Sequence, residues 1–255
     1  MGVPVLWHIE VSHFNEKVRW ALDYKGVEHR RRAPMPGILH PLVALAKTRN
    51  VTFPILDIDG ETIGDSTRII AELERRFPEP PLYPVDPEER RRALEIEDFF
   101  DEEVAPNVRR YAFYELSQDP DRAGDGLRML GLPMLPGPLA AAGVRVVARR
   151  YGGDSESSAP ARAATERGCE RVLAELGPSG YLVGDSFSVA DLTAASILFP
   201  LARPAEYQYV LPEWPDSVGE FVATLPEPAL EWVRRMWREH RGQSVEMGVR
   251  PRYTS

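Results

Sequence analysis

A short segment near residue 80 is too rich in proline to belong to a helix or an inner strand. PEPPLYPVDPEE, residues 78–89, contains five prolines. Proline has no backbone N–H and fixes its φ angle, so it interrupts regular elements and makes linkers stiff. The sequence therefore predicts two domains, residues 1–78 and 90–255, joined by a linker at 79–89.

The chain before the linker alternates between strand patterns and helix patterns. Ile55, Leu56 and Ile58 predict a strand, and the Asp59-Gly60 pair that follows is a common hairpin turn. The expected elements are a strand at 5–9, a helix at 14–24, an edge strand at 27–32, a helix at 38–47, strands at 55–58 and 61–63, and a helix at 67–77. A β-α-β unit followed by a hairpin and a closing helix predicts a thioredoxin-like α/β domain.

The first predicted helix begins just after a short turn that leaves the first strand. Phe14, Val18, Ala21 and Leu22 recur at helical spacing, which indicates a half-buried helix with one apolar stripe. Ser12 stands at the start of this helix. Small polar residues at that place usually cap the helix, so a cap is one interpretation of Ser12.

Strand patterns almost vanish after the linker, which predicts an all-helical second domain. The expected helices lie at 90–116, with a kink at Pro106, and at 166–176, 188–202, 216–225 and 226–240. The helix at 188–202 is the most apolar, and we expect it at the centre of the domain. Residues 117–160 indicate a helical hairpin or a lid, and residues 152–161 indicate a loose loop.

Composition excludes several classes of protein. The net charge of −8 argues against a nucleic-acid-binding protein, and no apolar run reaches the roughly 18 residues of a membrane span. With a single cysteine, Cys169, the chain has neither an internal disulfide nor a cysteine metal cluster. The N-terminus lacks the basic region and cleavage site of a signal peptide, so we expect a cytoplasmic protein without a metal.

Three motifs, in this order, resemble the cytosolic glutathione transferases in their serine-dependent, bacterial branch. SHFNEKVRWAL is similar to the first-helix motif of that family, FPIL and IGDSTRIIAEL to its third-strand and third-helix motifs, and YLVGDSFSVADL to a segment of its helical domain. Together with the proline linker, the resemblance spans most of the chain apart from residues 117–160. It implies a thioredoxin-like N-terminal domain that binds glutathione and an all-α C-terminal domain with a pocket for the acceptor substrate.

The resemblance implies that Ser12 holds the thiol of glutathione. The thiolate is the nucleophile, whereas the neutral thiol, with a pKa of about 8.5, reacts poorly at pH 7. A hydroxyl donor and a helix N-terminus both stabilise that anion. Ser12 is therefore the expected catalytic residue, and the alternative from the residues alone, a plain helix cap, stays open.

A second group of expected glutathione contacts lies around the third strand. By resemblance Pro54 is cis, which turns backbone groups of Phe53 towards the cysteinyl unit of glutathione, a form of strand addition. Phe14 in the first helix is a further contact. Thr52 stands where the family usually has a basic residue for the glycyl carboxylate. The basic residues nearby are His40, Lys47 and Arg49.

Asp65 and Ser66 stand at the start of the last helix of the first domain. Backbone N–H groups at a helix start, together with a hydroxyl, form a site for a carboxylate. The resemblance implies that the γ-glutamyl carboxylate binds at Ser66 and its ammonium group near Asp65. A helix cap is compatible with the same two residues.

Candidates for the acceptor pocket are His13 and three aromatic residues, Tyr111, Tyr114 and Trp214. His13 replaces a proline that is common in the resembling family and can adjust the entry of the helix or place a second donor near the sulfur. Aromatic residues at helical spacing are often core residues instead.

Three other polar or reactive residues are expected to have structural roles rather than catalytic ones. Ser188 and Asp191 match the capping-box pattern ahead of the apolar helix. Cys169 lies on an apolar helical face, which is typical of a core residue.

The favoured function is a detoxifying transferase, with glutathione as co-substrate and a small hydrophobic electrophile or a peroxide as its partner. We expect a homodimer whose contact includes the helix from Arg90. One alternative is a non-catalytic binding protein of the same fold. Another is a transferase of a different small thiol, because twenty-eight arginines against three lysines indicate a GC-rich genome, in which the cell thiol need not be glutathione.

Overall fold

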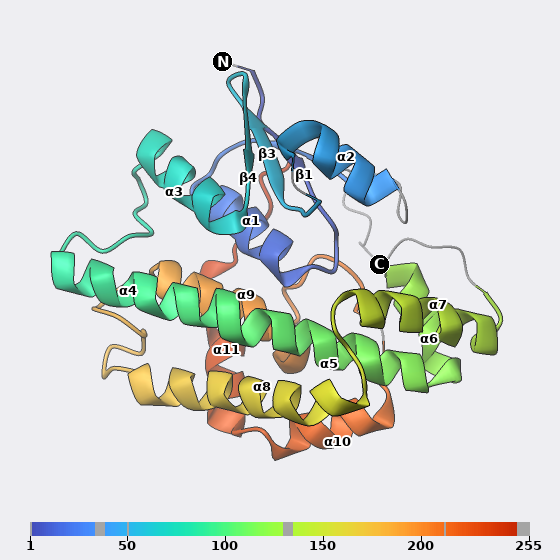
Figure 1. Ribbon diagram of the computed structural model, residues 1–255. Helices are drawn as coiled ribbons and strands as arrows, with labels where there is room; N and C mark the ends of the chain where they lie inside the picture. Colours follow the sequence, from blue (N-terminus) through green and yellow to red (C-terminus); the bar gives the residue numbers. More distant parts are fainter. Residues whose placement is uncertain (1, 34–38, 50, 130–134, 212, 249–255) are drawn as a thin grey trace.

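A four-stranded sheet forms the centre of the first domain (Figure 1). The computed structural model describes residues 2–33, 39–49, 51–129, 135–211 and 213–248. The strands are β1 (Val5–Trp7), β2 (Arg30–Arg32), β3 (Ile55–Ile58) and β4 (Glu61–Gly64), in the order β2-β1-β3-β4. β2 runs parallel to β1, whereas β3 is antiparallel to both β1 and β4. The edge position of β2 is confirmed, and β1 is shorter than the expected strand.

Three helices cover the two faces of this sheet. They are α1 (His13–Tyr24), α2 (Leu39–Thr48) and α3 (Ser66–Arg76). Side chains alternate along a strand, so neighbouring residues serve different faces. Leu56 joins the core that contains the apolar residues of α1 and α3, whereas Ile55 packs with Ala44 of α2. The thioredoxin-like arrangement that the sequence predicts is therefore present.

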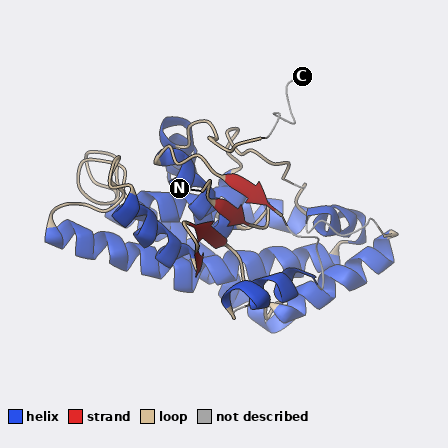
Figure 2. Cartoon of the chain, turned by 90° about the horizontal axis from the view of Figure 1, so that it is seen from above, coloured by secondary structure: helices blue, strands red, loops and turns tan. Residues whose placement is uncertain are grey.

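The rest of the chain is helical among the described residues. The helices are α4 (Pro87–Phe99), the π-helical segment η1 (Phe100–Val104), α5 (Ala105–Gln118), α6 (Pro120–Met129), α7 (Gly137–Arg150), α8 (Ser155–Glu175), α9 (Val189–Ala202), α10 (Asp216–Thr224) and α11 (Glu227–His240). Seen from above, the strands lie over the long helices (Figure 2). No helix in the described ranges is both long and apolar enough to cross a membrane.

The junctions differ in detail from the sequence expectations. α3 ends at Arg76 and α4 begins at Pro87, on either side of the proline-rich segment. η1 directly precedes Pro106, where the sequence predicts only a proline kink. α4, η1 and α5 therefore follow one another without an intervening loop.

α9 forms the centre of the helical domain, as its sequence predicts. Every residue of α9 is buried, and the helix packs against α1, α4 and α11. The expected capping box is present, since Asp191 Oδ2 accepts a hydrogen bond from the Ser188 N–H at 3.0 Å. Cys169 is buried as expected, and burial raises the pKa of its thiol to about 12.

The prediction of a loose loop at 152–161 is wrong. α8 begins at Ser155, because Asp154 and Ser157 form a capping box in which the Ser157 N–H donates to Asp154 Oδ1 at 2.8 Å. Ahead of it, α6 and α7 pack against each other as a helical hairpin, one of the two forms expected for residues 117–160. α7 also packs against α5.

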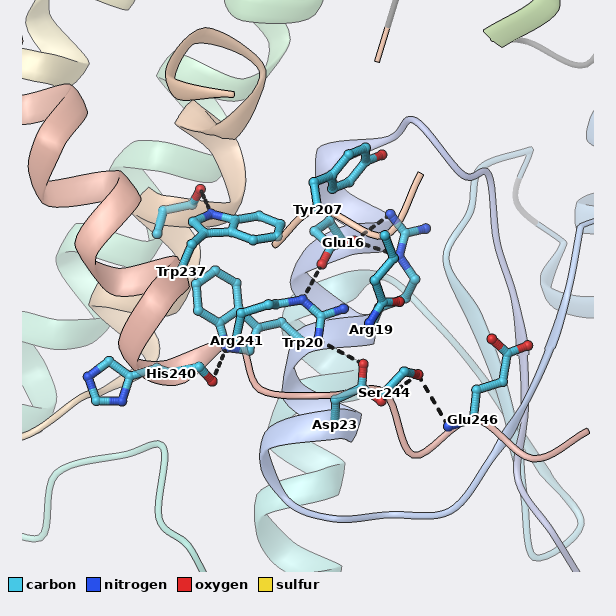
Figure 3. A network of polar contacts seen from close by, with 12 residues as sticks. Glu16, Arg19, Trp20, Asp23, Tyr207, Trp237, His240, Arg241, Ser244 and Glu246 are labelled. Atoms are coloured by element: carbon cyan, nitrogen blue, oxygen red, sulfur yellow. Dashed lines mark hydrogen bonds and ion pairs between the residues drawn. The ribbon is translucent and has the colours of Figure 1, made fainter. Parts of the chain in front are cut away.

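α1 is buried on its polar side as well as on its apolar side, which corrects the expectation of a half-buried helix. Lys17 and Arg19 are both 0% exposed. Arg241, directly after α11, donates to Glu16 Oε1 at 2.7 Å and to Asp23 Oδ2 at 2.8 Å (Figure 3). Ion pairs from a segment more than 200 residues away therefore cover the face that the sequence assigns to solvent.

The chain after α11 also attaches to the edge of the sheet. The Val245 N–H donates to Asp23 Oδ1 at 3.0 Å, and the Met247 N–H donates to the His29 carbonyl at 2.7 Å. A parallel bridge pairs His29 with Glu246. This C-terminal segment holds α1 and the β2 edge to the helical domain.

Candidate functional site

The register of the sheet brings the predicted site segments to one edge. Trp7 of β1 lies opposite Ile55 of β3, and Ile55 lies opposite Gly64 of β4. The loop after Trp7 leads to α1, Pro54 precedes Ile55, and α3 follows Gly64. The starts of α1, β3 and α3 therefore lie side by side. A Cβ on Gly64 would lie 3.1 Å from Cγ2 of Thr48, so glycine lets α2 approach the same edge.

Ser12 occupies the N-cap position of α1, but its hydroxyl makes no cap hydrogen bond. Its backbone N–H donates to the Ile9 carbonyl at 3.2 Å, and its own carbonyl accepts from the Glu16 N–H at 2.9 Å. The residue is partly exposed. A plain cap is defined by the side-chain hydrogen bond that is missing here. The hydroxyl is thus available to an anion at the positive end of the helix.

Two buried side chains in the first turn of α1 also leave a nitrogen without a partner. His13 is 5% exposed, and its Nε2 has no hydrogen bond with any described residue. Asn15 accepts from the Ile9 N–H at 3.2 Å, but its buried Nδ2 has no partner in the described ranges. Burial and the nearby charge of Arg109 lower the pKa of His13 to about 3, so its imidazole is neutral at pH 7. The His13 ring packs against Phe14, with centroids 4.7 Å apart.

The peptide bond between Phe53 and Pro54 is cis, as the resemblance implies. Phe53 is buried in a small cluster with Ala44 and Ile55, and Pro54 is buried beside it. Thr52 is exposed directly before them. The cis peptide therefore lies at the same edge of the sheet as the start of α1, and its contact with glutathione stays a prediction.

Asp65 and Ser66 begin α3 at this edge. Asp65 Oδ1 accepts from the Arg68 N–H at 3.1 Å, which makes Asp65 the N-cap. Asp65 also has a φ angle of 80°, a costly region for a residue other than glycine and one that is common at functional sites. Ser66 is 5% exposed, and its hydroxyl has no hydrogen bond within the described part of the chain.

A buried ion cluster ties these helix starts to the helical domain. Lys17 Nζ donates to Glu97 Oε1 at 2.7 Å and to Asp101 Oδ2 at 2.6 Å, and Asp101 Oδ2 also accepts from Thr67 Oγ1 at 2.9 Å. Burial opposes the charge on Lys17, but the two carboxylates raise its pKa. The cluster thus joins α1 and α3 to α4 and η1.

Comparison with known proteins identifies the domain that carries this edge. Residues 6–81 match the family model described as "Glutathione S-transferase, N-terminal domain". This part of the chain is similar to that domain. It includes the Ser12 turn, the cis peptide and the start of α3.

Similar proteins extend the likeness to the whole chain. A maleylacetoacetate isomerase of Dictyostelium discoideum is 24% identical over 230 residues, which are 87% of this chain and 85% of that protein. The structure of the β-etherase LigF from Sphingobium sp. strain SYK-6 is 21% identical, with a TM-score of 0.68 over 94% of this chain and 97% of that one. A glutathione S-transferase from Methylobacterium radiotolerans, in complex with glutathione sulfonate, is 18% identical, with a TM-score of 0.61 over 99% and 100%. The chain has the glutathione transferase fold.

The basic residues expected near the glycyl carboxylate of glutathione form no clear carboxylate site among the described residues. Lys47 Nζ pairs with Asp57 Oδ2 at 2.6 Å and lies 4.6 Å from the centroid of the Trp7 ring. Arg49 is exposed. The side chain of His40 lies outside the described residues.

The structure does not gather the expected acceptor residues into one pocket. His13 lies in the first turn of α1, whereas Tyr111 is 3% exposed and donates to a backbone carbonyl of α10 at 3.3 Å. Tyr114 lines a surface hollow of about 550 Å³ between α5 and α8. Trp214 Nε1 donates to the Pro200 carbonyl at 3.1 Å. A second hollow, of about 430 Å³, borders Phe77 and the far end of β3.

Arg109 of α5 is a residue that sequence reasoning missed. Its guanidinium carbon lies 4.1 Å from the centroid of the Tyr151 ring, and its charge acts on His13. Within the described part of the chain it has no carboxylate partner, and its buried Nε has no hydrogen bond. The next residue, Arg110, donates to Asn107 Oδ1 at 2.5 Å and to the Tyr151 carbonyl at 3.3 Å. Among twenty-eight arginines, no sequence pattern distinguishes Arg109.

The described residues offer no evident metal centre. Among them, no group of three or more histidine, cysteine, aspartate or glutamate side chains is placed to hold a metal ion. The polar side chains at the site edge are the hydroxyls of Ser12 and Ser66, the imidazole of His13, the amide of Asn15 and the carboxylate of Asp65, which caps α3.

Proposed function

We propose that this protein is a glutathione transferase of the serine-dependent type, in which Ser12 stabilises the glutathione thiolate. The observation that carries the proposal is the Ser12 hydroxyl, which has no cap bond at the start of α1. Because Ser12 is partly exposed, a ligand can reach this hydroxyl, which can donate a hydrogen bond to an anion at the start of the helix. The cis peptide before Pro54 and the start of α3 flank the same position.

The remaining contacts hold the tripeptide across the sheet edge. The backbone of Phe53 pairs with the cysteinyl unit, and Phe14 and Thr52 border it. The Ser66 hydroxyl and the first-turn N–H groups of α3 bind the γ-glutamyl carboxylate, while Asp65 lies near the ammonium group. A carboxylate at a helix N-terminus is favoured by the N–H groups and by the helix dipole.

The chemistry then needs a sulfur anion and an electrophile. The thiol proton leaves to solvent, and the Ser12 hydroxyl donates a hydrogen bond to the thiolate. The sulfur forms a bond to an electrophilic carbon, and the electron pair leaves with the displaced group. With an activated double bond, the π electrons instead move away from the attacked carbon, and water protonates the resulting anion. With a hydroperoxide, the sulfur bonds to the terminal oxygen as the O–O bond breaks, which gives a sulfenic acid and, after protonation, an alcohol; the thiol of a second glutathione then displaces water from the sulfenic acid and forms the disulfide.

Similar proteins support a thiol-dependent enzyme without fixing one reaction. The relatives bear the names of an isomerase, a β-etherase and a glutathione S-transferase. One of them was solved with glutathione sulfonate bound. We infer that the shared element is thiol chemistry, and that the acceptor differs between these proteins.

Turnover of the Ser12→Ala variant tests the proposal. We expect a loss of about 10- to 10³-fold in kcat/KM with glutathione and a neutral aryl halide, because one donor to an anion is worth that much. Ser157→Ala is the matched control, since it removes a serine of the α8 capping box far from the site and should keep its turnover. Unchanged turnover in Ser12→Ala would remove Ser12 from the chemistry.

A different small thiol is the second candidate, and one observation favours it. Lys47 is engaged by Asp57, and Thr52 stands where the resembling family has a base for the glycyl carboxylate. The shift in melting temperature on addition of glutathione, γ-glutamylcysteine, coenzyme A or mycothiol distinguishes a glutathione-dependent protein from one that uses another thiol. The main proposal predicts the largest shift with glutathione. A larger shift with another thiol would replace it, and binding without turnover would favour a non-catalytic protein of this fold.

The proposal also includes a homodimer in the cytoplasm, with residues 1–78 and 90–255 as its two domains. The expected contact joins the first domain of one protomer to the helix from Arg90 of its partner. Sedimentation of the full chain tests this assembly. A species of 28.7 kDa at micromolar concentration would contradict the dimer.

A further inference from the structure

We propose that Tyr207 of the helical domain is a positioning residue, which holds the turn before α1 in the form that aims the Ser12 hydroxyl at the sulfur of glutathione. The inference rests on the proposed function, because it concerns how the same serine is placed. It makes the helical domain a contributor to activation of the thiol. None of the sequence motifs contains Tyr207.

Ser12 is the last residue of a tight turn between β1 and α1. Its N–H donates to the Ile9 carbonyl at 3.2 Å, which places Glu10 and Val11 at the centre of the turn. This distance is at the long end of the usual range for such a bond. Because a peptide unit is planar, the direction of the Glu10 carbonyl fixes the plane that leads to Val11, and the next plane ends at Ser12. A group that holds the Glu10 carbonyl therefore also influences where the Ser12 side chain lies.

Two side chains hold this central carbonyl. Tyr207 Oη donates to the Glu10 carbonyl at 2.8 Å, and Arg19 Nη2 donates to the same oxygen at 2.7 Å. Arg19 Nη1 also donates to the Ile9 carbonyl at 3.2 Å. Both bonds to Glu10 are shorter than the bond that closes the turn, so the conformation of the turn depends on donors outside it.

Tyr207 is itself held by the core of the helical domain. It lies in the loop after α9, and the centroid of its ring lies 4.4 Å from that of Phe199 in α9 and 5.9 Å from that of Trp237 in α11. Burial raises the pKa of its phenol, so the hydroxyl keeps its proton and remains a donor. A donor fixed in this way connects the packed helices with a backbone group two residues before Ser12.

The two donors differ in how many acceptors they serve. Arg19 divides its guanidinium among a carboxylate, an imidazole and two backbone carbonyls. The Tyr207 hydroxyl has one proton to donate, and its bond to Glu10 uses it. Loss of that bond should loosen the turn without releasing it, because Arg19 remains. The effect on the sulfur should therefore be smaller than that of removing the Ser12 hydroxyl.

The test combines two substitutions in one cycle. The pKa of the thiol of bound glutathione is measured from the thiolate absorbance in wild type, Tyr207→Phe, Ser12→Ala and the double variant. Tyr207→Phe removes the hydroxyl and keeps the ring. Tyr181→Phe is the matched control, because this half-buried hydroxyl of the helical domain bonds to His240 Nε2 at 3.1 Å and not to the turn. Circular dichroism and thermal unfolding establish that each variant is folded.

The inference predicts a rise in the pKa of the thiol that depends on Ser12. Tyr207→Phe should raise this pKa by about 0.5 to 1 unit, the order of one hydrogen bond, and Tyr181→Phe should leave it unchanged. The double variant should show the same rise as Ser12→Ala alone, because Tyr207 acts through Ser12.

Two further measurements distinguish positioning from a general loss of structure. Below the pKa of the bound thiol, kcat/KM of Tyr207→Phe should be about 3- to 10-fold lower than that of wild type, and the difference should vanish at a pH above both pKa values. S-methylglutathione, which has no thiol, should bind equally well to wild type and to Tyr207→Phe.

The outcomes separate this inference from the proposed function. A wild-type thiol pKa in Tyr207→Phe, together with a raised pKa in Ser12→Ala, would overturn the inference and leave the proposed function standing. A further rise in the double variant beyond that of Ser12→Ala would also overturn it, because Tyr207 would then act on the sulfur by another route. An unchanged pKa in Ser12→Ala would end the proposed function and this inference with it.

Discussion

The first turn of α1 and the turns that follow it are similarly buried but differ in how their polar groups are paired. From Glu16 onwards the charged side chains are paired: Glu16 and Asp23 both bond to Arg241, and Lys17 bonds to two acids. In the first turn, the nitrogen Nε2 of His13 has no hydrogen bond in the described ranges, and the Ser12 hydroxyl makes no cap bond. One helix therefore carries both charged side chains that are all paired and a His13 nitrogen that is not. On the partner side, Glu97 Oε2, Asp101 Oδ1 and Arg241 Nη2 have no hydrogen bond in the described ranges.

The difference indicates which residues of α1 stabilise the fold and which are available for ligand binding. Ion pairs from Glu16 onwards join α1 to Arg241, directly after α11, and to η1, so they hold the two domains together. The buried nitrogen atoms of His13 and Asn15 that lack a partner cost free energy, about 1–3 kcal/mol for each buried group. Changes to the paired charged residues should therefore reduce stability, whereas changes at Ser12 and His13 should mainly alter ligand binding.

The largest effect on stability should come from Arg241→Met. The substitution leaves the buried carboxylates of Glu16 and Asp23 with fewer partners, which costs about 3–5 kcal/mol in the free energy of unfolding. Urea unfolding followed by tryptophan fluorescence measures it. Arg238→Met is the control, because its pair with Glu231 is exposed and screened by water and should change the stability much less. Equal losses in the two variants would contradict the comparison.

An intermediate effect on the free energy of unfolding should appear when the His13→Phe variant and wild type are compared at different pH values. His13 has an ordinary pKa of 6.5 and a folded pKa of about 3, because burial and Arg109 disfavour its charged form. Between these values the unfolded chain binds a proton that the folded chain does not. Wild type should thus lose about 1.4 kcal/mol of unfolding free energy for each unit that the pH falls below 6.5 from His13 alone.

The His13→Phe variant lacks this contribution, so its stability should exceed that of wild type increasingly as the pH falls from 6 to 4. Other groups add acid sensitivity to both proteins, among them His8, whose pKa is lowered by burial and Arg19, and His29, whose pKa burial and Arg31 lower to about 4. Unfolding curves at several pH values measure the difference. Parallel pH profiles of the two proteins would show that His13 is not buried and neutral.

The smallest effect on stability should come from replacing Ser12 and Ser188, two serines that both occupy N-cap positions but differ in their hydrogen bonds. Ser188 accepts a hydrogen bond from the Ala190 N–H and belongs to a capping box, so Ser188→Ala should cost about 1 kcal/mol. Ser12 makes no cap bond, so Ser12→Ala should leave the melting temperature nearly unchanged. A loss in Ser12→Ala as large as that in Ser188→Ala would restore the plain-cap interpretation.

Features encoded in neighbouring residues could be predicted from the sequence. The apolar run and the capping pattern around Ser188 predicted α9, and the Asp59-Gly60 pair predicted the β3–β4 hairpin. The cis peptide at Pro54 followed from a family resemblance. The start of α8 was missed although Asp154 and its capping partner stand in the sequence, because serine and proline in the same stretch indicated a loop.

Features that depend on distant contacts could not be predicted. The polar side of α1 is buried by Arg241, which lies 225 residues after Glu16, and the hydropathy pattern of α1 contains no trace of that contact. The half-buried position of Arg109 against Tyr151 arises only when α5 packs against α7. The acceptor candidates Tyr111 and Tyr114 failed to gather for the same reason, since spacing within α5 does not determine which side of α5 faces the site.

The pKa of the thiol of bound glutathione tests the central claim most directly. The ultraviolet absorbance of the thiolate, titrated with pH in the complexes of wild type and of Ser12→Ala, reports it. We predict a pKa well below the value of about 8.5 for a free thiol in wild type, and a return towards that value in Ser12→Ala. The same pKa in both complexes would contradict the claim that Ser12 stabilises the sulfur anion.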